Sequence, residues 1–334
     1  MPFFVADLGG TYLRCAVAGG GHGLAVVQRY RFRDEISERG DDFWAALIDD
    51  VAAFCAEKEE LVSRDAPLVF AFPGPVTDGR ISSTAPTVIG RERVPDLGSL
   101  LEQRTQRRVV LINDVSAAAW YFAEQLRADR FAVVTVSSGI GAKLFDRRHP
   151  GGVFDELPYA GEIGHLIVDR TSEAVCDCGA RGHLGAIASG RGIERAARRA
   201  AVLEPEEFAA SACSTLFRAH APSLTNEDHL VPAALLGDPW VLNIIREAVA
   251  PLAATLLTLI VGAGLERVAL MGGFAQRLGS TYLSALRTAI VEATDAGPAQ
   301  FDVEGVLAIS RTGIEPGLLG AARYGELQNR ILQP

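Results

Sequence analysis

A carboxylate and two glycines stand together near the start of the sequence and could hold a metal–nucleotide complex. Asp7 ends an apolar run and is followed by Leu8, Gly9, Gly10 and Thr11. Glycines let backbone N–H groups approach a polyphosphate without a Cβ in the way, and a carboxylate beside them suits Mg²⁺. The threonine hydroxyl is a further donor. The same segment is also typical of a tight hairpin turn without a ligand.

Two more glycine turns follow apolar runs later in the chain. One contains Ser138, Gly139 and Gly141, and it repeats the phosphate-binding argument in a second half of the protein. The other contains Gly272 and Gly273; a nucleotide base could lie against it, and it is equally typical of a plain strand-to-helix turn. A strand is expected after Gly141, so the dinucleotide fingerprint does not fit, and no Walker A motif is present. The residues predicted to bind ATP are Asp7, Gly9, Gly10, Thr11, Ser138, Gly139, Gly141, Gly272 and Gly273.

Asn113 and Asp114 lie where an apolar run passes into a helical pattern. Both residue types are good helix N-caps, which is one interpretation of the pair. The other interpretation places both side chains at the mouth of a cleft. Asp114 would then accept a proton from an attacking hydroxyl, and Asn113 would bind a neighbouring hydroxyl. Phosphoryl transfer depends mostly on positioning and charge stabilisation, so a carboxylate with Mg²⁺ and backbone donors is sufficient machinery.

Four metal-binding side chains fall within a short segment: His165, Cys176, Cys178 and His183. Two thiolates and two imidazoles match a closed tetrahedral zinc site. No catalytic carboxylate accompanies the cluster, so the zinc would be structural and would hold the loop carrying Glu162 and His165. The alternative is two buried free thiols and two unrelated histidines.

Apolar periodicity indicates the elements that must position these residues. The predicted strands are 3–8, 12–18, 25–31, 68–72, 109–113, 131–137, 142–145, 267–271 and 306–310. The predicted helices are 41–61, one that begins near Asp114, 189–201, 206–220, 239–262, 279–296 and 317–331. Strand, glycine turn, strand occurs twice, near Gly9 and near Gly139, which favours two related halves facing a cleft.

The bulk properties are those of a soluble globular protein. The chain has 334 residues, of which 49% are hydrophobic and 22% charged, and this is enough for two domains with their own cores. A net charge of −9 without a long basic run argues against nucleic acid or an anionic membrane as a partner. No signal peptide is recognised, and the longest apolar stretch, 248–264, contains Pro251 and suits a buried helix. We therefore expect a cytoplasmic protein.

Taken together, these residues resemble the ROK family of sugar kinases and repressors, within the actin-like ATPase fold. The resemblance covers nearly the whole chain, and the order and spacing of its motifs are specific. They are D-L-G-G-T at Asp7, P-G-P-V at Pro73, N-D at Asn113, G-I-G at Gly139, G-E-I-G-H at Gly161 and C-D-C-G-A-R-G at Cys176. The expected fold is α/β, two-lobed and ribonuclease H-like, with a cleft between the lobes. We expect a small lobe over 1–115 completed by the helix 317–334, and a large lobe over 116–316 that carries the zinc loop.

The resemblance also implies roles for individual residues. Asp114 would be the general base, and His165 would bind zinc together with the cysteine-rich loop. The implied cofactors are ATP, Mg²⁺ and a structural Zn²⁺, and the implied assembly is a homodimer. The expected substrate-binding residues are Gly74, Thr87, Asn113, Asp114, Glu162, His165 and Gly185.

Three positions depart from the family pattern. His183 stands where the family usually has a third cysteine, an exchange that zinc accepts. Gly185 replaces a common sugar-binding glutamate, and Thr87 replaces a sugar-binding asparagine of many members. Losing a carboxylate deletes a charge-assisted hydrogen bond, typically worth about 1.5–3 kcal/mol. We therefore expect a modified ring rather than plain glucose: an amino sugar, an N-acyl hexosamine or a C7-cyclitol.

The function expected from the sequence is ATP-dependent phosphorylation of a primary hydroxyl, the 6-position of a hexose by family analogy. One alternative is a plain glucokinase. Another is a catalytically inactive sugar-binding sensor, because Ser137 and Ser138 replace the more usual Gly-Thr before the second glycine turn. A sugar-responsive repressor would carry a DNA-binding helix-turn-helix ahead of the kinase-like fold, and with Asp7 so near the first residue we do not expect one.

Overall fold

The computed structural model describes residues 1–10, 12–19, 23–31, 42–81, 94–294, 302–313 and 315–332. Two of the predicted site residues, Thr11 and Thr87, lie outside these ranges. The chain divides into two compact units. Unit 1 comprises Met1–Arg127, Arg148–Ala160 and Glu315–Pro334, and unit 2 comprises Ala128–Arg147 and Gly161–Ile314. The boundary expected between residues 115 and 116 falls inside a helix of unit 1.

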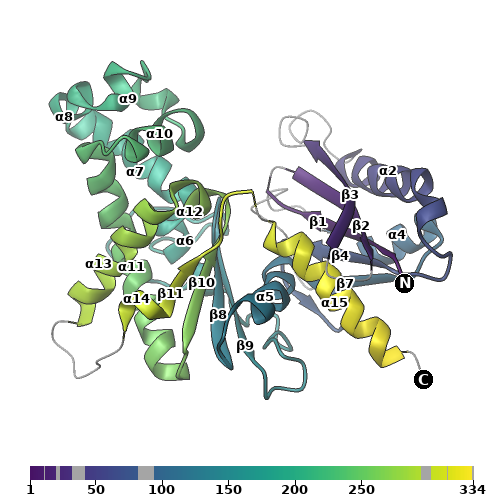
Figure 1. Ribbon diagram of the computed structural model, residues 1–334. Helices are drawn as coiled ribbons and strands as arrows, with labels where there is room; N and C mark the ends of the chain where they lie inside the picture. The colour runs from purple at the N-terminus through teal and green to yellow at the C-terminus, as the bar shows by residue number, and fades with distance from the viewer. Residues whose placement is uncertain are drawn as a thin grey trace. The chain divides into compact units, whose positions relative to one another are not determined.

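Unit 1 is built on a five-stranded sheet with the order β3-β2-β1-β4-β7 (Figure 1). Its strands are β1 (Phe3–Leu8), β2 (Tyr12–Gly19), β3 (Gly23–Arg31), β4 (Leu68–Phe72) and β7 (Val109–Asn113). The first three form the predicted antiparallel meander, and β1, β4 and β7 run parallel. β1 and β4 are buried at every residue, which agrees with uninterrupted apolar runs in strands covered on both faces.

Helices cover both faces of this sheet. α2 (Asp42–Glu57) and α4 (Leu97–Thr105) pack on one face, around a core that includes Phe4, Phe54 and Phe70. A short 3₁₀-helix follows α2 at Glu59–Leu61, and a small hairpin of β5 (Val76–Thr77) and β6 (Arg80–Ile81) follows β4.

The other face of the sheet is covered by α5 (Asp114–Gln125) and α15 (Pro316–Leu332). Leu318 on α15 packs in a core with Phe3 of β1. The two helices approach closely, because a Cβ at Gly320 would collide with the backbone of α5. The last helix of the sequence therefore packs in the unit that contains the first strand.

Unit 2 contains a four-stranded sheet with the order β11-β10-β8-β9 (Figure 1). Its strands are β8 (Arg130–Val136), β9 (Ile140–Asp146), β10 (Arg267–Met271) and β11 (Leu307–Ile309). β8 and β9 form an antiparallel hairpin, and β10 pairs in parallel with β8 and β11. Unit 1 has the same relation between the hairpin β1–β2 and β4. Both units thus repeat the strand, glycine turn, strand pattern found in the sequence.

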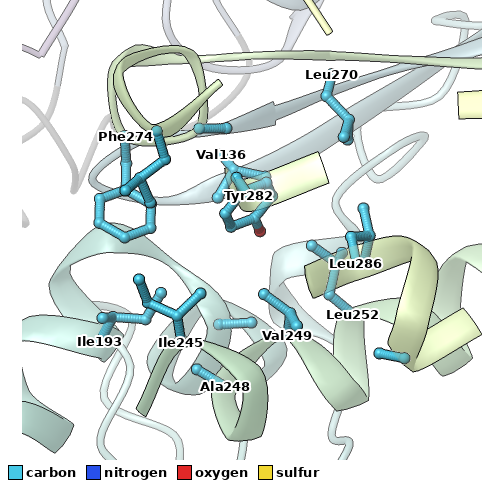
Figure 2. Close-up of a cluster of buried hydrophobic side chains, with 14 of the residues drawn as sticks. Val136, Ile193, Ile245, Ala248, Val249, Leu252, Leu270, Phe274, Tyr282 and Leu286 are labelled. Carbon is cyan, nitrogen blue, oxygen red and sulfur yellow. The ribbon is translucent and has the colours of Figure 1, made fainter. Parts of the chain in front are cut away.

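The core of unit 2 lies between its sheet and the helices α7 (Gly190–Leu203), α11 (Pro239–Ala263) and α13 (Ser280–Thr294). Figure 2 shows Ile245, Val249 and Leu252 of α11 gathered with Tyr282 and Leu286 of α13. By length and composition α11 could cross a membrane, but half of its most apolar window is buried in this core. α11 is therefore a buried helix of the unit 2 core, as the sequence predicts.

The prediction of one helix over 206–220 is wrong. The chain forms α8 (Pro205–Ala210) and α9 (Ala212–Thr215), with Ser211 extended between them at φ −68° and ψ 156°. Ser211 caps α9, and the N–H of Ala212 donates to Asp238 Oδ2 at 2.7 Å. A distant carboxylate thus takes the N–H that would otherwise continue the helix.

Other helical segments of unit 2 are short and were not resolved by apolar periodicity. They are α6 (Leu184–Ala188), α10 (Val231–Leu235), α12 (Gly273–Leu278), α14 (Val303–Val306), 3₁₀ turns at Ile163–His165 and Ala221–Ser223, and a π-helical turn at Asn226–Leu230. Segments of one or two turns bury too few residues to show a 3.6-residue period.

Candidate functional site

Asp7 lies near the end of β1, and its carboxylate is held from two sides. Arg14 Nη1 donates to Asp7 Oδ2 at 3.1 Å. Gly317, in the first turn of α15, comes so close that a Cβ there would lie 2.9 Å from Asp7 Oδ1. Burial raises the pKa of Asp7 to about 6, against the opposing effect of the Arg14 charge. A carboxylate oriented in this way at a strand end has the chemistry of a Mg²⁺ ligand.

Gly9 and Gly10 lie in the turn that joins β1 to β2. The N–H of Gly9 donates to the carbonyl of Tyr12 at 2.9 Å, which closes the predicted hairpin. A side chain at Gly9 would displace Arg14, whose Nη1 lies 2.9 Å from the position of a Cβ. The hairpin is confirmed, whereas phosphate binding by this turn, which includes Thr11 outside the described residues, stays a prediction.

Asn113 joins the end of β7 to the start of α5. Its Oδ1 accepts hydrogen bonds from the N–H groups of Val115 and Ser116 at 3.0 and 2.9 Å, so Asn113 is the N-cap of α5. Its Nδ2 donates to the carbonyl of Gly74 at 3.0 Å and to Asp114 Oδ1 at 3.1 Å. Asn113 therefore ties the candidate base to the turn after β4.

Asp114 is the first residue of α5 and is half-buried. Its Oδ1 accepts from the N–H of Val115 at 2.9 Å as well as from Asn113. The positive end of the helix also favours a carboxylate there. The side chain is thus fixed in orientation without being fully buried, and both properties suit a general base.

Three chain segments meet beside the ends of β8 and β10 in unit 2. The N–H of Ser137 donates to the carbonyl of Gly139 at 3.0 Å, which closes the turn around Ser138. The N–H of Gly190, the first residue of α7, donates to the carbonyl of Ser137 at 2.7 Å. A Cβ at Gly273 would lie 3.8 Å from Ser137 Oγ. The structure therefore brings together two predicted glycine turns and the start of a 14-residue helix.

Gly272 and Gly141 differ in what their backbone requires. Gly272 has a φ of 99°, and a Cβ there would lie 2.6 Å from the carbonyl oxygen of Val136, so the position needs glycine. Gly272 lies in the turn between β10 and α12, in agreement with the strand-to-helix turn that is one interpretation of the sequence. Gly141 lies within β9, opposite Thr135, rather than in the turn.

The four predicted metal ligands converge in unit 2. The ligand atoms of His165, Cys176, Cys178 and His183 all lie within 4.8 Å of one another. Cys176 Sγ is 3.7 Å from His165 Nδ1, and Cys178 Sγ is 3.4 Å from His183 Nδ1. Zinc with bonds of about 2.3 Å to sulfur and about 2.0 Å to nitrogen separates such ligand pairs by roughly 3.5 Å in a tetrahedron. The residues therefore fit one zinc ion with four protein ligands.

A tight loop positions the two cysteines. The N–H of Cys176 donates to the carbonyl of Ala180 at 2.8 Å, and the N–H of Gly179 donates to the carbonyl of Cys176 at 2.7 Å. Between the cysteines, Asp177 forms an ion pair of 2.8 Å with Arg191 of α7. The loop is thus closed by its own backbone hydrogen bonds and attached to α7 by the Asp177–Arg191 ion pair.

His165 lies between the cysteine cluster and Glu162. Its Nδ1 faces Cys176, and its Nε2 lies 3.8 Å from Glu162 Oε2. Burial raises the pKa of Glu162, and the charges of His165 and Lys143 oppose that effect. A carboxylate on the far side of a metal-ligating histidine commonly fixes the orientation of its ring. Glu162 and His165, two of the three predicted sugar contacts in unit 2, are therefore neighbours, and a metal ion on Nδ1 of His165 would orient them.

The glycines of the G-E-I-G-H motif pack tightly on β9. A Cβ at Gly161 would collide with the carbonyl of Ala142, and one at Gly164 with the carbonyl of Ile140. Gly185, in α6, packs in turn on Gly164, whose carbonyl oxygen would lie 3.1 Å from a Cβ at Gly185. Gly185 therefore lies, without a side chain, beside the segment that carries Glu162 and His165.

Comparison with known proteins decides the family. The sequence model of the ROK family matches residues 4–325. This chain belongs to the ROK family. A ROK family glucokinase from Streptomyces griseus, solved with glucose and AMPPNP, superposes with a TM-score of 0.77 at 23% identity, over 98% of this chain and 100% of that one. A ROK hexokinase from Thermus thermophilus superposes with a TM-score of 0.70 at 26% identity, over 99% of this chain and 100% of that one. Both neighbours have the actin-like fold, which confirms the predicted fold class.

Two relatives of this ROK protein are named as 7-kinases. A C(7)-cyclitol 7-kinase of Streptomyces hygroscopicus subsp. jinggangensis is 36% identical over 96% of this chain and 94% of that protein. A 2-epi-5-epi-valiolone 7-kinase of an Actinoplanes species is 32% identical over 85% of this chain and 81% of that protein.

Two charged residues beside Asp7, Arg14 and Glu315, are not among the predicted site residues. Arg14 had a local signal, because a hairpin closed by Gly9 and Tyr12 pairs Asp7 with Arg14. Glu315 had none, since it reaches Arg14 from the far end of the chain at 3.1 Å. Only the packing of α15 on the first strands brings it there.

Proposed function

We propose that this chain is an ATP-dependent kinase that phosphorylates the exocyclic primary hydroxyl of a C7-cyclitol or a similarly modified sugar. The observation that carries the proposal is the similarity, along almost the whole chain, to a C(7)-cyclitol 7-kinase. The valiolone 7-kinase similarity supports the same substrate class. The local geometry of the family motifs in both units agrees with a kinase.

Asp114 is the proposed general base for the acceptor hydroxyl. An alcohol is a weak nucleophile until its proton is removed, and a fixed carboxylate within reach can accept that proton during transfer. Asn113 holds Asp114 through its amide and caps the helix behind it. We assign Asn113 first to orienting the base; a sugar hydroxyl bound by Asn113 would share donors that already contact Gly74 and Asp114.

The glycine turns are the proposed nucleotide contacts. ATP supplies the phosphoryl group, and Mg²⁺ neutralises its charge. In unit 1 we assign Gly9, Gly10 and Thr11 to phosphate and Asp7 to the metal ion. In unit 2 we assign Ser138, Gly139 and Gly141 to phosphate, supported by the nearby start of α7, because helix N-termini favour anions. Gly272 and Gly273 are the proposed contacts of the adenine base of ATP.

A structural zinc ion is the proposed ligand of the cluster of His165, Cys176, Cys178 and His183. It would fix His165, and with it Glu162, for contact with the sugar. A dimer and a cytoplasmic location are proposed by family analogy. The four-ligand geometry leaves zinc no open position, so the metal would have no part in the chemistry.

Gly185 supports a modified ring over plain glucose. Without a side chain, the position offers no carboxylate to a ring hydroxyl. The backbone packs there on Gly164, whose carbonyl oxygen would lie 3.1 Å from a Cβ at Gly185. Thr87, the second position of this argument, lies outside the described residues. The expected acceptor is thus a ring that does not need the missing glutamate.

The test is ADP release by purified protein with Mg-ATP across a panel of acceptors. The panel contains 2-epi-5-epi-valiolone and other C7-cyclitols, N-acetylmannosamine, N-acetylglucosamine, 3-amino-3-deoxyglucose, mannose and glucose. We expect the highest kcat/KM with a C7-cyclitol. In Asp114→Asn, turnover should fall by about 10²–10⁴-fold while the acceptor still binds, because the variant loses the proton acceptor and keeps the shape.

The other outcomes are equally informative. Best turnover on glucose would support a glucokinase and discard the argument from Gly185. Binding of an acceptor without turnover on any of them would support the inactive sensor. Near-normal turnover in Asp114→Asn would remove Asp114 from the mechanism.

A further inference from the structure

Asp7, Arg14 and Arg29 form one row across the first three strands of unit 1. The strand register pairs Asp7 with Arg14, and Arg14 with Arg29. Paired side chains on one face of a sheet lie about 4.5–5.5 Å apart, so two adjacent arginines would repel each other. Glu315 lies between them, with Oε2 at 3.1 Å from Arg14 Nε and Oε1 at 3.2 Å from Arg29 Nη2. One carboxylate from the start of α15 thus neutralises the row.

Arg14 is the centre of this row and has only 17% of its side chain exposed. Its Nη1 hydrogen-bonds to Asp7 Oδ2, and the same nitrogen fills the space that a side chain on Gly9 would take. Its contact with Glu315 is electrostatic, because Nε is close to the carboxylate without hydrogen-bond alignment. Arg14 therefore touches both the proposed metal carboxylate and the proposed phosphate turn.

The two oxygens of Asp7 are in different surroundings. Oδ2 accepts from Arg14, whereas Oδ1 has no hydrogen-bond donor among the residues that the structure describes, and lies against Gly317. Mg²⁺ prefers oxygen ligands and is usually bound through one or two carboxylates with several waters retained. A carboxylate with one oxygen fixed and the other without a donor fits that requirement.

We propose that Arg14 is the positioning residue for Asp7. It holds Oδ2 so that Oδ1 is presented to the metal ion of the nucleotide, and Glu315 holds Arg14 in turn. This inference rests on the proposed kinase function. It gives the first turn of α15 a part in the phosphate site, because Glu315 and Gly317 both contact the row.

Three variants test this role. Arg14→Met keeps an apolar stem and removes the charge and the fork of donors. Arg14→Lys keeps the charge but loses the planar fork that reaches two carboxylates at once. Arg29→Met is the matched control, since it removes the other arginine bound to Glu315 and leaves the Arg14–Asp7 pair intact.

The main measurement is binding of Mn²⁺-AMPPNP, followed through the electron paramagnetic resonance of Mn²⁺, which needs no turnover. We expect Arg14→Met to weaken binding by about tenfold or more, because a charge-assisted contact that fixes the ligand is lost. Arg14→Lys should lie between Arg14→Met and the unmodified protein, and Arg29→Met should stay within about twofold of the latter. In turnover, KM for Mg-ATP should rise in Arg14→Met while KM for the acceptor does not change.

An unchanged affinity in folded Arg14→Met, or an equal loss in Arg29→Met, overturns the inference. If circular dichroism shows that Arg14→Met does not fold, Arg14→Lys becomes the deciding variant. Affinity of Arg14→Lys for Mn²⁺-AMPPNP equal to that of the unmodified protein would then exclude positioning of Asp7 by the Arg14 guanidinium group. Failure of the unmodified protein to phosphorylate any acceptor, with metal–nucleotide binding intact, contradicts the proposed function instead. The comparison of Mn²⁺-AMPPNP affinities between the variants and the unmodified protein would then still test the role of Arg14.

Discussion

Two single residues of the candidate site, Asp114 and Gly185, matter for different reasons. Asp114 is fixed by donors from Asn113 and Val115, so its orientation is set before any substrate arrives. Gly185 has no side chain, at a point where the backbone packs on Gly164. In the proposed function, the first residue would bear on the rate and the second on the choice of acceptor.

Replacing Gly185 with glutamate should move selectivity towards glucose. The new carboxylate restores a charge-assisted hydrogen bond, so the ratio of kcat/KM for glucose to that for a C7-cyclitol should rise by about tenfold or more. Gly185→Ala is the control, because it adds only the Cβ that would lie 3.1 Å from the Gly164 carbonyl oxygen. A ratio that changes equally in both variants, or in neither, would contradict the role of this position.

At the scale of elements, the cysteine loop is held by backbone hydrogen bonds and by the ion pairs Asp177–Arg191 and Glu173–Arg181. It connects His165 to His183, and His183 begins α6 directly. A metal ion that bound both histidines would therefore fix the G-E-I-G-H segment and α6 at once. Folding free energy and sugar binding should both depend on the metal.

Purified protein should contain about one zinc per chain, and removing it with a chelator should lower the melting temperature by about 5 °C or more. KM for the acceptor should rise more than KM for ATP, because the loop carries Glu162 and His165. Zinc content by mass spectrometry and thermal unfolding check this. Cys178→Ser should lose the metal, whereas Cys213→Ala, which changes a buried thiol outside the cluster, should retain it. A metal-free protein with full stability and activity would refute the zinc site.

At the scale of the whole molecule, each unit has its own apolar core, and that of unit 2 contains an isolated polar atom. Tyr282 is fully buried among Val136, Phe274, Leu252 and other apolar side chains (Figure 2). Its hydroxyl has no hydrogen-bond partner among the described residues, and burial raises its pKa. An unpaired hydroxyl in a core costs stability.

Tyr282→Phe should therefore stabilise the protein by about 1 kcal/mol and raise the melting temperature by about 1–2 °C. Differential scanning calorimetry measures both. Tyr30→Phe is the control, because the Tyr30 hydroxyl donates to Gln28 Oε1 at 2.8 Å and its removal should give no gain. A less stable Tyr282→Phe would mean that the hydroxyl is paired, for example with a buried water.

The sequence by itself determined the features that depend on neighbouring residues. The apolar runs located β1, β4 and β7, and the turn glycines located both hairpins. Four possible metal ligands within nineteen positions indicated a candidate metal site, and the structure brings these side chains together. These features could be predicted because strand pairing across a tight turn and ligand spacing in a short loop are local properties of the chain.

Only the tertiary structure decided the contacts between distant segments. Asp238 ends α8 at Ser211, Gly185 packs on Gly164, and Glu315 reaches Arg14 from the start of α15. No periodicity near these residues indicates such partners, because they meet only after sheets and helices have packed. The motifs around Asp7 and Asp114 are therefore local, and so is the hairpin that pairs Arg14 with Asp7. The contact of Glu315 with Arg14 and the packing of Gly185 on Gly164 are set by long-range packing.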